Sequence, residues 1–178
     1  MKLPILLHPD PLLKKVAAPV ADVTDELRTL ADKMLSTMYE APGIGLAAPQ
    51  VGVLSRLIVL DCIKGDEDTP RPLAMLNPEV IASSDELNTY DEGCLSIPDI
   101  FADVTRPEVV TVRWMDLNGA EQEETFDGLW ATCVQHEIDH LEGKLFIDYL
   151  SGLKRQLITR KMVKLKRDLA RERAGGNA

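Results

Sequence analysis

The sequence predicts an α+β fold, in which antiparallel β-sheets pack around a central helix and one further helix lies near each end of the chain. Three segments are predicted to be helical, the strand-like segments do not alternate regularly with them, and one segment carries a strong β-hairpin signal. Regular alternation would instead favour a doubly wound parallel sheet. The length of 178 residues is typical of one domain with a substantial core.

The first predicted helix covers residues 22–40. Its apolar residues recur at helical spacing: Leu27, Leu30, Met34, Leu35 and Met38. Thr24 is a plausible N-cap, and acidic residues occupy the first turn. The next segment, "APGIGLAAPQVG" (41–52), contains proline and glycine and sustains neither a helical nor a strand period. We therefore expect the helix to end there.

The strand-like segments follow and are bounded by turn residues: 56–62, 73–83 with an interruption at Pro78, and 108–126. The first of these is predicted to be a buried strand, and a polar loop with two prolines (64–72) follows it. The last consists of two alternating runs joined at Asn118–Gly119, a dipeptide typical of tight hairpin turns.

The central helix is predicted from about Leu129 to Glu142, and Asp127 or Gly128 precedes it. Gly143 is placed to adopt the left-handed conformation that ends many helices. We assign residues 1–150 to the body of the protein, which would hold any catalytic site, 151–173 to a basic C-terminal helix of the same single domain, and 174–178 to a flexible tail.

The composition is that of an ordinary globular protein, with 45% hydrophobic and 28% charged residues. Three cysteines far apart in the sequence do not suggest a disulfide framework, and reduced thiols fit better. The N-terminal apolar run is too short for a signal peptide, and no stretch approaches the roughly 20 apolar residues that span a bilayer. We expect a cytoplasmic protein with no membrane partner.

The net charge of −9 is unevenly distributed. Residues 154–173 contain nine Lys or Arg against two acidic residues, a balance of +7, so the rest of the chain carries −16. One interpretation is a solvated basic helix. The other is a surface that docks on RNA phosphates or on an acidic partner.

The most informative motif is "HEIDH" (136–140). On a helix, His136 and His140 lie one turn apart, about 6 Å, with Glu137 beside them. Two neutral imidazoles at this spacing can bind one divalent metal, and the carboxylate can handle protons of water. The alternative is a hydrogen-bonded histidine pair on a charged helix.

A catalytic metal site usually has a third protein ligand. The known continuation H-E-x-x-H-x-x-G-x-x-H places Phe146 at the last position, where it cannot ligate, and the acids after Glu142 are few: Asp148, Asp168 and Glu172. His8 lies in a proline-rich segment and is expected at the surface.

The cysteines offer another route to the third ligand. Cys133 lies roughly 7 Å along the helix axis from the point between the histidines, too far for a bond of about 2.3 Å, so we expect it in the core or lining a pocket. Cys62 ends a buried strand and is most simply a small apolar residue. Cys94, after Gly93 and before a short extended run, could present a thiolate to the helix, or could be another buried thiol.

Three segments together resemble one family. "GIGLAAPQ" (43–50), "EGCLS" (92–96) and "HEIDH" (136–140) are similar to the three signature motifs of bacterial peptide deformylase, in the same order and at similar separations. The likeness extends over essentially the whole chain. The resemblance implies an enzyme that removes the formyl group from the N-terminal formyl-methionine of new polypeptides and releases formate.

The resemblance also implies roles for particular residues. Metal ligands would be Cys94, His136 and His140, and Glu137 would be the general base and acid. Gln50 and the backbone N–H of Leu95 would stabilise the oxyanion. Residues next to the substrate would be Gly43, Ile44 and Gly45 along the peptide backbone, with Leu129 and Cys133 as candidates, beside Ile44, for the methionine pocket.

The metal implied by the family is Fe²⁺ in the cell, with Zn²⁺, Ni²⁺ or Co²⁺ accepted as well. Several relatives carry an arginine shortly after "CLSIP" that holds the peptide backbone, and Phe101 stands there in this chain. Bacterial relatives use a C-terminal helix on the ribosome, which gives residues 151–173 a candidate partner, possible ribosomal RNA contacts included. We expect a monomer. The competing hypotheses are a zinc-dependent endopeptidase and a non-catalytic, ribosome-associated metal-binding module.

Overall fold

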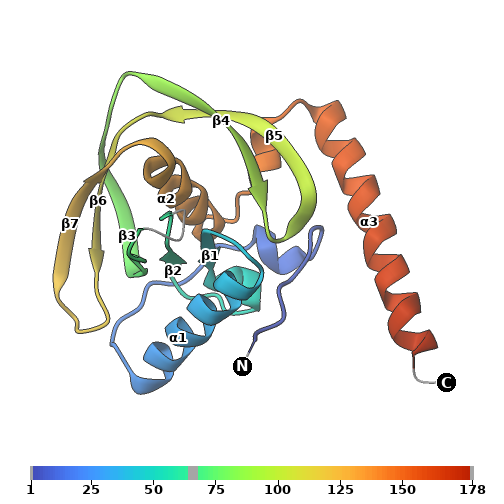
Figure 1. The fold of residues 1–178 in the computed structure, drawn as a ribbon, viewed down its shortest axis with the longest axis horizontal. Coiled ribbons are helices and arrows are strands. Elements are labelled where there is room, and N and C mark those ends of the chain that lie inside the picture. Colours follow the sequence, from blue (N-terminus) through green and yellow to red (C-terminus); the bar gives the residue numbers. More distant parts are fainter. Residues whose placement is uncertain (1, 64–67, 177–178) are drawn as a thin grey trace.

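The computed structural model describes residues 2–63 and 68–176, so residues 64–67 of the loop predicted at 64–72 and the last two residues of the predicted tail lie outside the described residues. It confirms the α+β class (Figure 1). The helices are α1 (Asp25–Glu40), α2 (Gly128–Leu141) and α3 (Gly152–Gly175), and three short 3-10 helices are η1 (Pro11–Lys14), η2 (Ala48–Val51) and η3 (Phe146–Tyr149).

The strands form two antiparallel sheets. The first has five strands in the order β1-β2-β3-β6-β7, with these bounds: β1 (Gly45–Ala47), β2 (Leu57–Leu60), β3 (Leu73–Ser83), β6 (Val110–Met115) and β7 (Glu121–Phe126). The second is a long ribbon of β4 (Leu87–Cys94) and β5 (Ile97–Pro107). Figure 1 shows α2 lying between the sheet and the ribbon.

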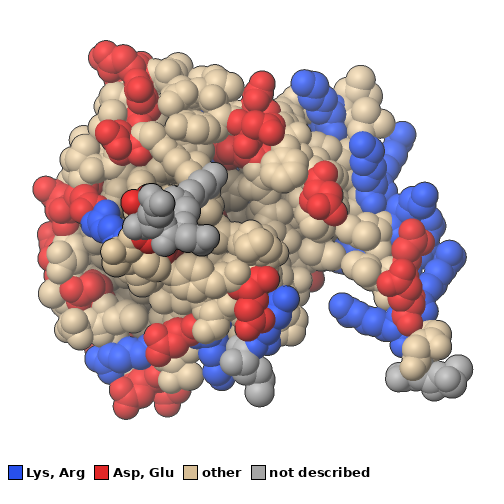
Figure 2. All heavy atoms as spheres, viewed as in Figure 1, with Lys and Arg blue, Asp and Glu red and all other residues tan. Residues whose placement is uncertain are grey.

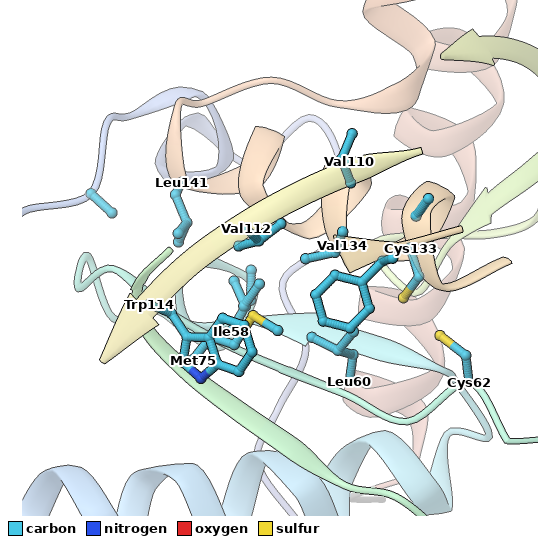
Figure 3. Packing of buried hydrophobic residues seen from close by; sticks show 14 residues of the cluster. Ile58, Leu60, Cys62, Met75, Val110, Val112, Trp114, Cys133, Val134 and Leu141 are labelled. Atoms are coloured by element: carbon cyan, nitrogen blue, oxygen red, sulfur yellow. The ribbon is translucent and has the colours of Figure 1, made fainter. Parts of the chain in front are cut away.

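The five-stranded sheet is covered on both faces. From β2, Ile58 and Leu60 pack with α2, whereas Leu57 and Val59 pack with α1. Because both faces are buried, β2 is apolar at every position, as predicted for a buried strand. Figure 3 shows the α2 side of this core, with Ile58, Leu60 and Met75 facing Val134 and Leu141.

A third apolar cluster attaches α3 to the body. Ile158 and Met162 of α3 are buried against residues of η1, β5 and η3, which include Leu13, Val104 and Phe146. No other residue in the described part of α3 is buried. The helix therefore buries only a narrow stripe and leaves most of its charged residues in solvent. Lys166 differs, because it donates a hydrogen bond to the backbone carbonyl of Leu7 at 3.3 Å.

Several predicted boundaries are confirmed. The Thr24 hydroxyl caps α1 by accepting a hydrogen bond from the N–H of Leu27 at 3.2 Å. Gly143 ends α2 with a φ of 72° and lies against the backbone carbonyl of Lys14, where a side chain would collide. The β6–β7 hairpin turns at Gly119, whose φ is 82°. α3 includes Ala174 and Gly175, which the sequence had assigned to the tail.

Other expectations need correction. Residues 41–52 were predicted to have no regular structure, but they contain β1 and η2. The interruption predicted at Pro78 is a shift in pairing and not the end of a strand. β3 runs from Leu73 to Ser83, but its register with β6 shifts between Leu76 and Glu79, the interval that contains Pro78. The ribbon of β4 and β5 was not predicted, since its strands are rich in acidic and other polar residues. In the folded protein the even-numbered side chains of the ribbon face inward, because the ribbon packs on α2 and η3. The sequence alone does not show which side chains these contacts bury.

No helix in the described residues is long and apolar enough to cross a membrane.

Candidate metal centre

The two histidines of α2 face the interior of the molecule. His136 is 8% exposed and His140 is 1% exposed, and the centroids of their rings are 5.1 Å apart. The spacing of four residues on a helix places both rings on one face, as the sequence predicted. Their position between the sheet and the ribbon excludes the alternative of a histidine pair on a solvated surface.

Cys94 reaches these histidines from the end of β4. Its Sγ lies 3.4 Å from Nε2 of His140, and the ligand atoms of Cys94, His136 and His140 all lie within 4.8 Å of one another. The register of the ribbon shifts between Gly93 and Cys94, and an irregularity of this kind re-aims the side chain that follows it. Two segments far apart in sequence therefore converge on one point.

The three residues fit a single divalent ion. Bonds of about 2.3 Å to sulfur and about 2.0–2.1 Å to nitrogen in a tetrahedral site would place the two ligand atoms roughly 3.6 Å apart, close to the separation of Cys94 and His140. Burial, and the positive charge of a nearby protonated His136, hold the pKa of His140 well below its ordinary value, so its ring is a neutral donor. Burial also lowers the pKa of His136, but the hydrogen bonds to Cys94 and Glu92 outweigh burial and raise it well above its ordinary value. The groups that raise it, Cys94, Glu92 and Glu137, favour a positive charge at this place, and a metal cation would also be favoured there.

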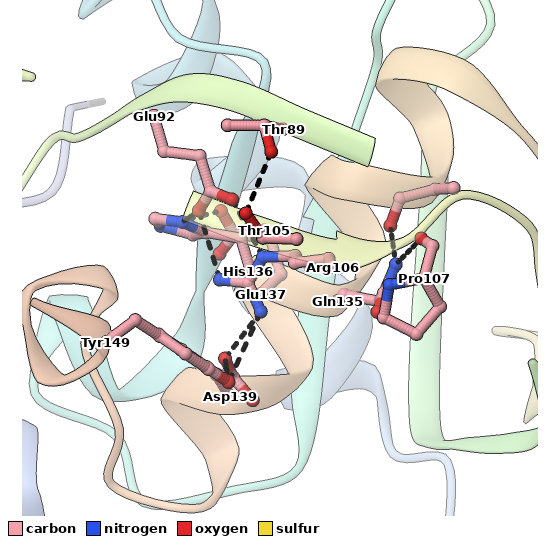
Figure 4. Close-up of polar contacts among 11 residues, drawn as sticks. Thr89, Glu92, Thr105, Arg106, Pro107, Gln135, His136, Glu137, Asp139 and Tyr149 are labelled. Atoms are coloured by element: carbon pink, nitrogen blue, oxygen red, sulfur yellow. Dashed lines mark hydrogen bonds and ion pairs between the residues drawn. The ribbon is translucent and has the colours of Figure 1, made fainter. Parts of the chain in front are cut away.

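A buried polar network orients His136 (Figure 4). Nδ1 of His136 lies 2.9 Å from Oε1 of Glu92. Arg106 donates one hydrogen bond to each carboxylate oxygen of Glu92, at 2.7 Å to Oε2 and at 3.0 Å to Oε1. Arg106 in turn donates to Asp139 at 2.8 Å, and the hydroxyl of Tyr149 donates to the same Asp139 oxygen at 2.7 Å. Burial favours a neutral Glu92, but the hydrogen bonds from His136 and Arg106 lower its pKa. The ring orientation of His136 therefore depends on a carboxylate that is itself ion-paired.

Sequence reasoning did not assign a function to Glu92 and Arg106. Glu92 lies in the quoted motif "EGCLS" and Asp139 lies in "HEIDH", so both were visible as charged residues beside candidate ligands. Arg106 had no such signal, because it lies 14 residues from Glu92 and meets it only across the ribbon.

Glu137 points into the same site. Its side chain is 4% exposed, one oxygen lies 4.0 Å from Nε2 of His136, and the other has no hydrogen-bond partner in the described residues. Burial raises the pKa of Glu137 to about 7, with the charge of His136 opposing and that of Glu92 adding to the increase. A carboxyl group with this pKa can both accept and release a proton near neutral pH.

Gln50 is fixed in the site from η2. Its side-chain oxygen accepts from the N–H of Ala47 at 2.9 Å, and its side-chain nitrogen donates to Ser96 at 3.1 Å and to the sulfur of Cys94 at 3.4 Å. Leu95 lies in the turn between β4 and β5, beside Cys94. The structure therefore brings the amide of Gln50 to the position of the candidate ligands.

A cavity of about 870 Å³ is lined by residues of this site: Cys94, Leu95, His136 and Glu137. All five residues that the sequence proposed next to a substrate line it: Gly43, Ile44, Gly45, Leu129 and Cys133. A side chain at Gly45 would lie 2.6 Å from Glu137 and 2.9 Å from the sulfur of Cys133, and one at Gly43 would lie 2.8 Å from Leu95. A side chain at Gly45 would therefore collide with two buried residues of the site, whereas one at Gly43 would require only that the flexible end of Leu95 move.

The remaining cysteines and His8 lie outside the ligand cluster. Cys133 lines the cavity, and its thiol stays protonated because a neighbouring Cys62 and burial raise its pKa well above the ordinary value. Cys62 is buried in the apolar core, and Figure 3 shows the two sulfurs turned toward each other. The expectation for His8 is wrong: it is only 6% exposed, and its Nε2 lies 2.8 Å from the hydroxyl of Thr159 in α3, because the N-terminal segment packs under that helix.

Comparisons with known proteins all point to one family. Residues 2–156 match the family model of polypeptide deformylase. The chain is 53% identical over 161 residues to the peptide deformylase of Rhizobium meliloti (strain 1021), a match that covers 90% of this chain and 92% of that protein.

Solved structures agree with these matches. The crystal structure of a peptide deformylase from Legionella pneumophila is 45% identical with a TM-score of 0.87, and the match covers 96% of this chain and 99% of that one. Peptide deformylase from Ehrlichia chaffeensis in complex with actinonin is 38% identical with a TM-score of 0.89, covering 93% and 98%. The chain belongs to the polypeptide deformylase family.

Proposed function

We propose that this protein removes the formyl group from the N-terminal formyl-methionine of newly synthesised polypeptides, with Cys94, His136 and His140 as the ligands of one divalent metal. The observation that carries the proposal is the convergence of these three side chains on one point. Two of them, Cys94 and His136, line the cavity that residues 43–45 also line. The reaction is a hydrolysis, in which water adds to the formyl carbon, the carbon–nitrogen bond breaks, and formate and a free amine result.

Cys94, His136 and His140 would hold the metal, and a site with three protein ligands would keep one position for water, whereas a closed structural site has four protein ligands. When bound, a divalent metal would act as a Lewis acid and would lower the pKa of its water from the bulk value to roughly 7. Glu92 and Arg106 support this site by holding the ring of His136 in one orientation.

Glu137 carries the protons of the reaction. Its carboxylate takes a proton from the attacking water and later delivers it to the leaving amine nitrogen, so that the carboxylate is regenerated in each turnover. Its pKa of about 7 and its unpartnered buried oxygen suit both transfers.

Gln50 and Leu95 stabilise the charge that develops on the formyl oxygen. The side-chain N–H of Gln50 and the backbone N–H of Leu95 donate to this oxygen, and removal of one such donor typically lowers kcat about 10²- to 10³-fold. The hydrogen bond from Ala47 to Gln50 sets which end of the amide faces the site.

The substrate peptide lies along the edge strand β1. Backbone groups of Gly43, Ile44 and Gly45 hold the peptide backbone, and the methionine side chain enters the apolar part of the cavity beside Ile44, Leu129 and Cys133. The protonated thiol of Cys133 suits contact with an apolar side chain.

We propose Fe²⁺ as the metal bound in the cell. A donor set of one thiolate and two imidazoles also accepts Zn²⁺, Ni²⁺ or Co²⁺, and affinity alone favours zinc over iron. Metal analysis after purification without oxygen tests this assignment, and zinc as the metal of fully active, anaerobically prepared enzyme would contradict it.

We also propose a cytoplasmic monomer that meets its substrate at the ribosome. New polypeptides emerge there, and the three free cysteines suit a reducing compartment. The basic residues of α3 gather on one side of the molecule, away from the acidic body (Figure 2). If they contact ribosomal RNA, the logarithm of ribosome affinity will fall steeply with the logarithm of salt concentration. Binding that ignores salt would contradict this docking surface.

The decisive experiment is formate release from formyl-Met-Ala under anaerobic conditions. We expect Glu137→Ala to retain its metal but to lose at least about 10²-fold in kcat, since general acid–base catalysis is typically worth 10²- to 10⁴-fold. We expect Cys94→Ala to lose the metal and with it the activity. Cys62→Ala is the matched control, because it removes a buried thiol outside the ligand cluster.

The other outcomes separate the competing hypotheses. Cleavage at internal peptide bonds without formate release would support an endopeptidase. Metal binding with no turnover of either substrate would support a non-catalytic module. If Cys94→Ala binds metal and works normally, the ligand assignment is wrong.

A further inference from the structure

Two buried thiols meet where the five-stranded sheet packs against α2. Cys62 follows β2 and Cys133 belongs to α2, and the two residues are 6% and 5% exposed. Both belong to one apolar cluster, in which their sulfurs are turned toward each other (Figure 3). Contact with Cys62 is also the largest cause of the raised pKa of Cys133. The third cysteine of the chain, Cys94, lies in the ligand cluster instead, so a bound metal would occupy its sulfur.

The two thiols differ in their access to the cavity. Cys133 lines it together with Ile44 and Leu129, whereas Cys62 is not among the described residues that line it. The Cys133 thiol also donates a weak hydrogen bond to the backbone carbonyl of Ile44 at 3.5 Å. A small molecule in the cavity therefore meets Cys133 first, and the sulfur of Cys62 is the nearest partner within the core.

The surroundings of Cys133 determine which reagents can reach it. Ile44 and Leu129 form an apolar wall beside it, where we place the unbranched thioether side chain of methionine. A small uncharged disulfide is a similar chain of carbon and sulfur, so it can enter the same part of the cavity. A charged disulfide such as oxidised glutathione would lose much of its hydration on entry, which disfavours it.

We propose that Cys62 and Cys133 are a site of reversible modification, at which a small uncharged disulfide oxidises the two thiols to an internal disulfide bond. The choice of reagent rests on the proposed function, whereas the pairing of the two sulfurs does not. Cys133 attacks one sulfur of the reagent, and the departing half leaves as a thiol with the proton that Cys133 has lost. Cys62 then attacks the sulfur of Cys133 and expels the second half as a thiol. Two protein thiols are oxidised, and one reagent disulfide is reduced to two thiols.

The two steps differ in rate, and their product affects the cavity. The first step is slow, because the thiolate is the attacking species and the pKa of Cys133 is raised well above its ordinary value. The second step is intramolecular between neighbouring sulfurs, so it proceeds at a high effective concentration. The new bond removes the hydrogen bond from Cys133 to Ile44, which belongs to the segment proposed to hold the substrate. We therefore expect weaker substrate binding with no loss of metal.

The test is prolonged anaerobic incubation of the metal-loaded protein with 2-hydroxyethyl disulfide, followed by mass spectrometry of the intact protein and of its peptides. We expect the parent to lose two hydrogens, to retain no reagent, and to yield a linked pair of peptides that contain Cys62 and Cys133. The KM for formyl-Met-Ala should rise about threefold at unchanged metal content, because one weak hydrogen bond is lost. Dithiothreitol should reverse both changes.

Two variants test the order of the steps. Cys62→Ala lacks the second thiol, so Cys133 should keep one half of the reagent as a mixed disulfide, and its activity before treatment should match that of the parent. Cys133→Ala lacks the thiol that lines the cavity, so Cys62 should stay unmodified. Oxidised glutathione should link the two thiols of the parent much more slowly than 2-hydroxyethyl disulfide. Equal rates would contradict entry through the apolar part of the cavity.

The outcomes separate the thiol site from the proposed function. If Cys62 and Cys133 stay unlinked in the parent, or if the internal bond includes Cys94, the thiol site is refuted whatever the activity. If the linked pair forms but the untreated parent releases no formate, the proposed function fails and the thiol site stands. If the pair forms and the KM is unchanged, the effect of the bond on substrate binding is refuted.

Discussion

The surroundings of the ligand cluster and the basic helix α3 differ in how far their charged side chains are exposed to solvent. Beside α2, charged groups are held by one another in a largely buried network: Arg106 is 5% exposed and bridges Glu92 and Asp139. Along α3, the charged groups project into solvent, and two buried apolar residues connect the helix to the body.

This difference determines how each region responds to mutation. When a buried ion pair loses one partner, the remaining charge is out of reach of water, so the protein loses much of its stability. An exposed charge that loses its partner is solvated by water and screened by salt, so the protein loses little stability. The α2 region should therefore be intolerant of charge changes, whereas α3 should tolerate them and respond only to changes in its apolar stripe.

The largest effect is expected from Arg106→Met. The substitution leaves the buried Glu92 and the partly buried Asp139 without Arg106, and we expect the free energy of unfolding to fall by about 3–5 kcal/mol. Because Glu92 orients His136, metal affinity should also fall by about 10- to 100-fold. Urea unfolding and metal titration measure the two effects.

Arg113→Met is the matched control. Arg113 also pairs with two carboxylates, those of Glu121 and Glu123, but its side chain is 46% exposed. We expect its loss to lower stability by less than about 1 kcal/mol. Equal losses in the two variants would show that the buried network has no special importance.

A smaller effect is expected from Met162→Ala in α3. Met162 is 1% exposed and packs against the body, so its truncation should cost about 2–4 kcal/mol, felt first as faster hydrogen exchange of the α3 amides. Lys161→Ala, its exposed neighbour, should change stability by less than about 0.5 kcal/mol. If both variants leave exchange in α3 unchanged, the helix is held by contacts other than its apolar stripe.

The smallest effect is expected where the two regions meet. Lys14 of η1 contacts both carboxylate oxygens of Asp148 in η3 at 2.8 Å, with side chains 44% and 26% exposed. Lys14→Met should therefore lower the free energy of unfolding at pH 7 by less than about 1 kcal/mol.

The pH dependence of that difference has a definite sign. Burial tends to raise the pKa of Asp148, but the hydrogen bond and charge of Lys14 outweigh it and the folded-state pKa is lowered. The ion pair therefore stabilises the fold above the ordinary aspartate value of 3.8 and is lost as the pH falls through the lowered value. Unfolding of parent and variant should converge in acid, and a difference that grows there would contradict the assignment.

Local patterns in the sequence were sufficient for much of the fold. Helical spacing and capping residues predicted α1 and α2 within a few residues, and Asn118–Gly119 predicted the β6–β7 turn. These features depend on neighbours a few positions apart, so the sequence contains them directly. The ribbon of β4 and β5 was not predicted because its sequence shows no clear alternation of apolar and polar residues. Its two faces differ in burial only because one of them packs against the rest of the protein.

The residues of the candidate site also fall into two groups, those that local spacing could indicate and those that only the folded chain brings together. The spacing of His136 and His140 was enough to indicate a metal-binding face, because a helix brings positions four apart together. Cys94, Gln50 and Arg106 lie on other elements, and spacing could not rank Cys94 above an ordinary buried thiol. Those side chains meet α2 only through the pairing of β4 with β5 and the path of the chain through η2. Contacts of that kind depend on which distant surfaces pack together, a property of the whole folded chain and not of any one segment.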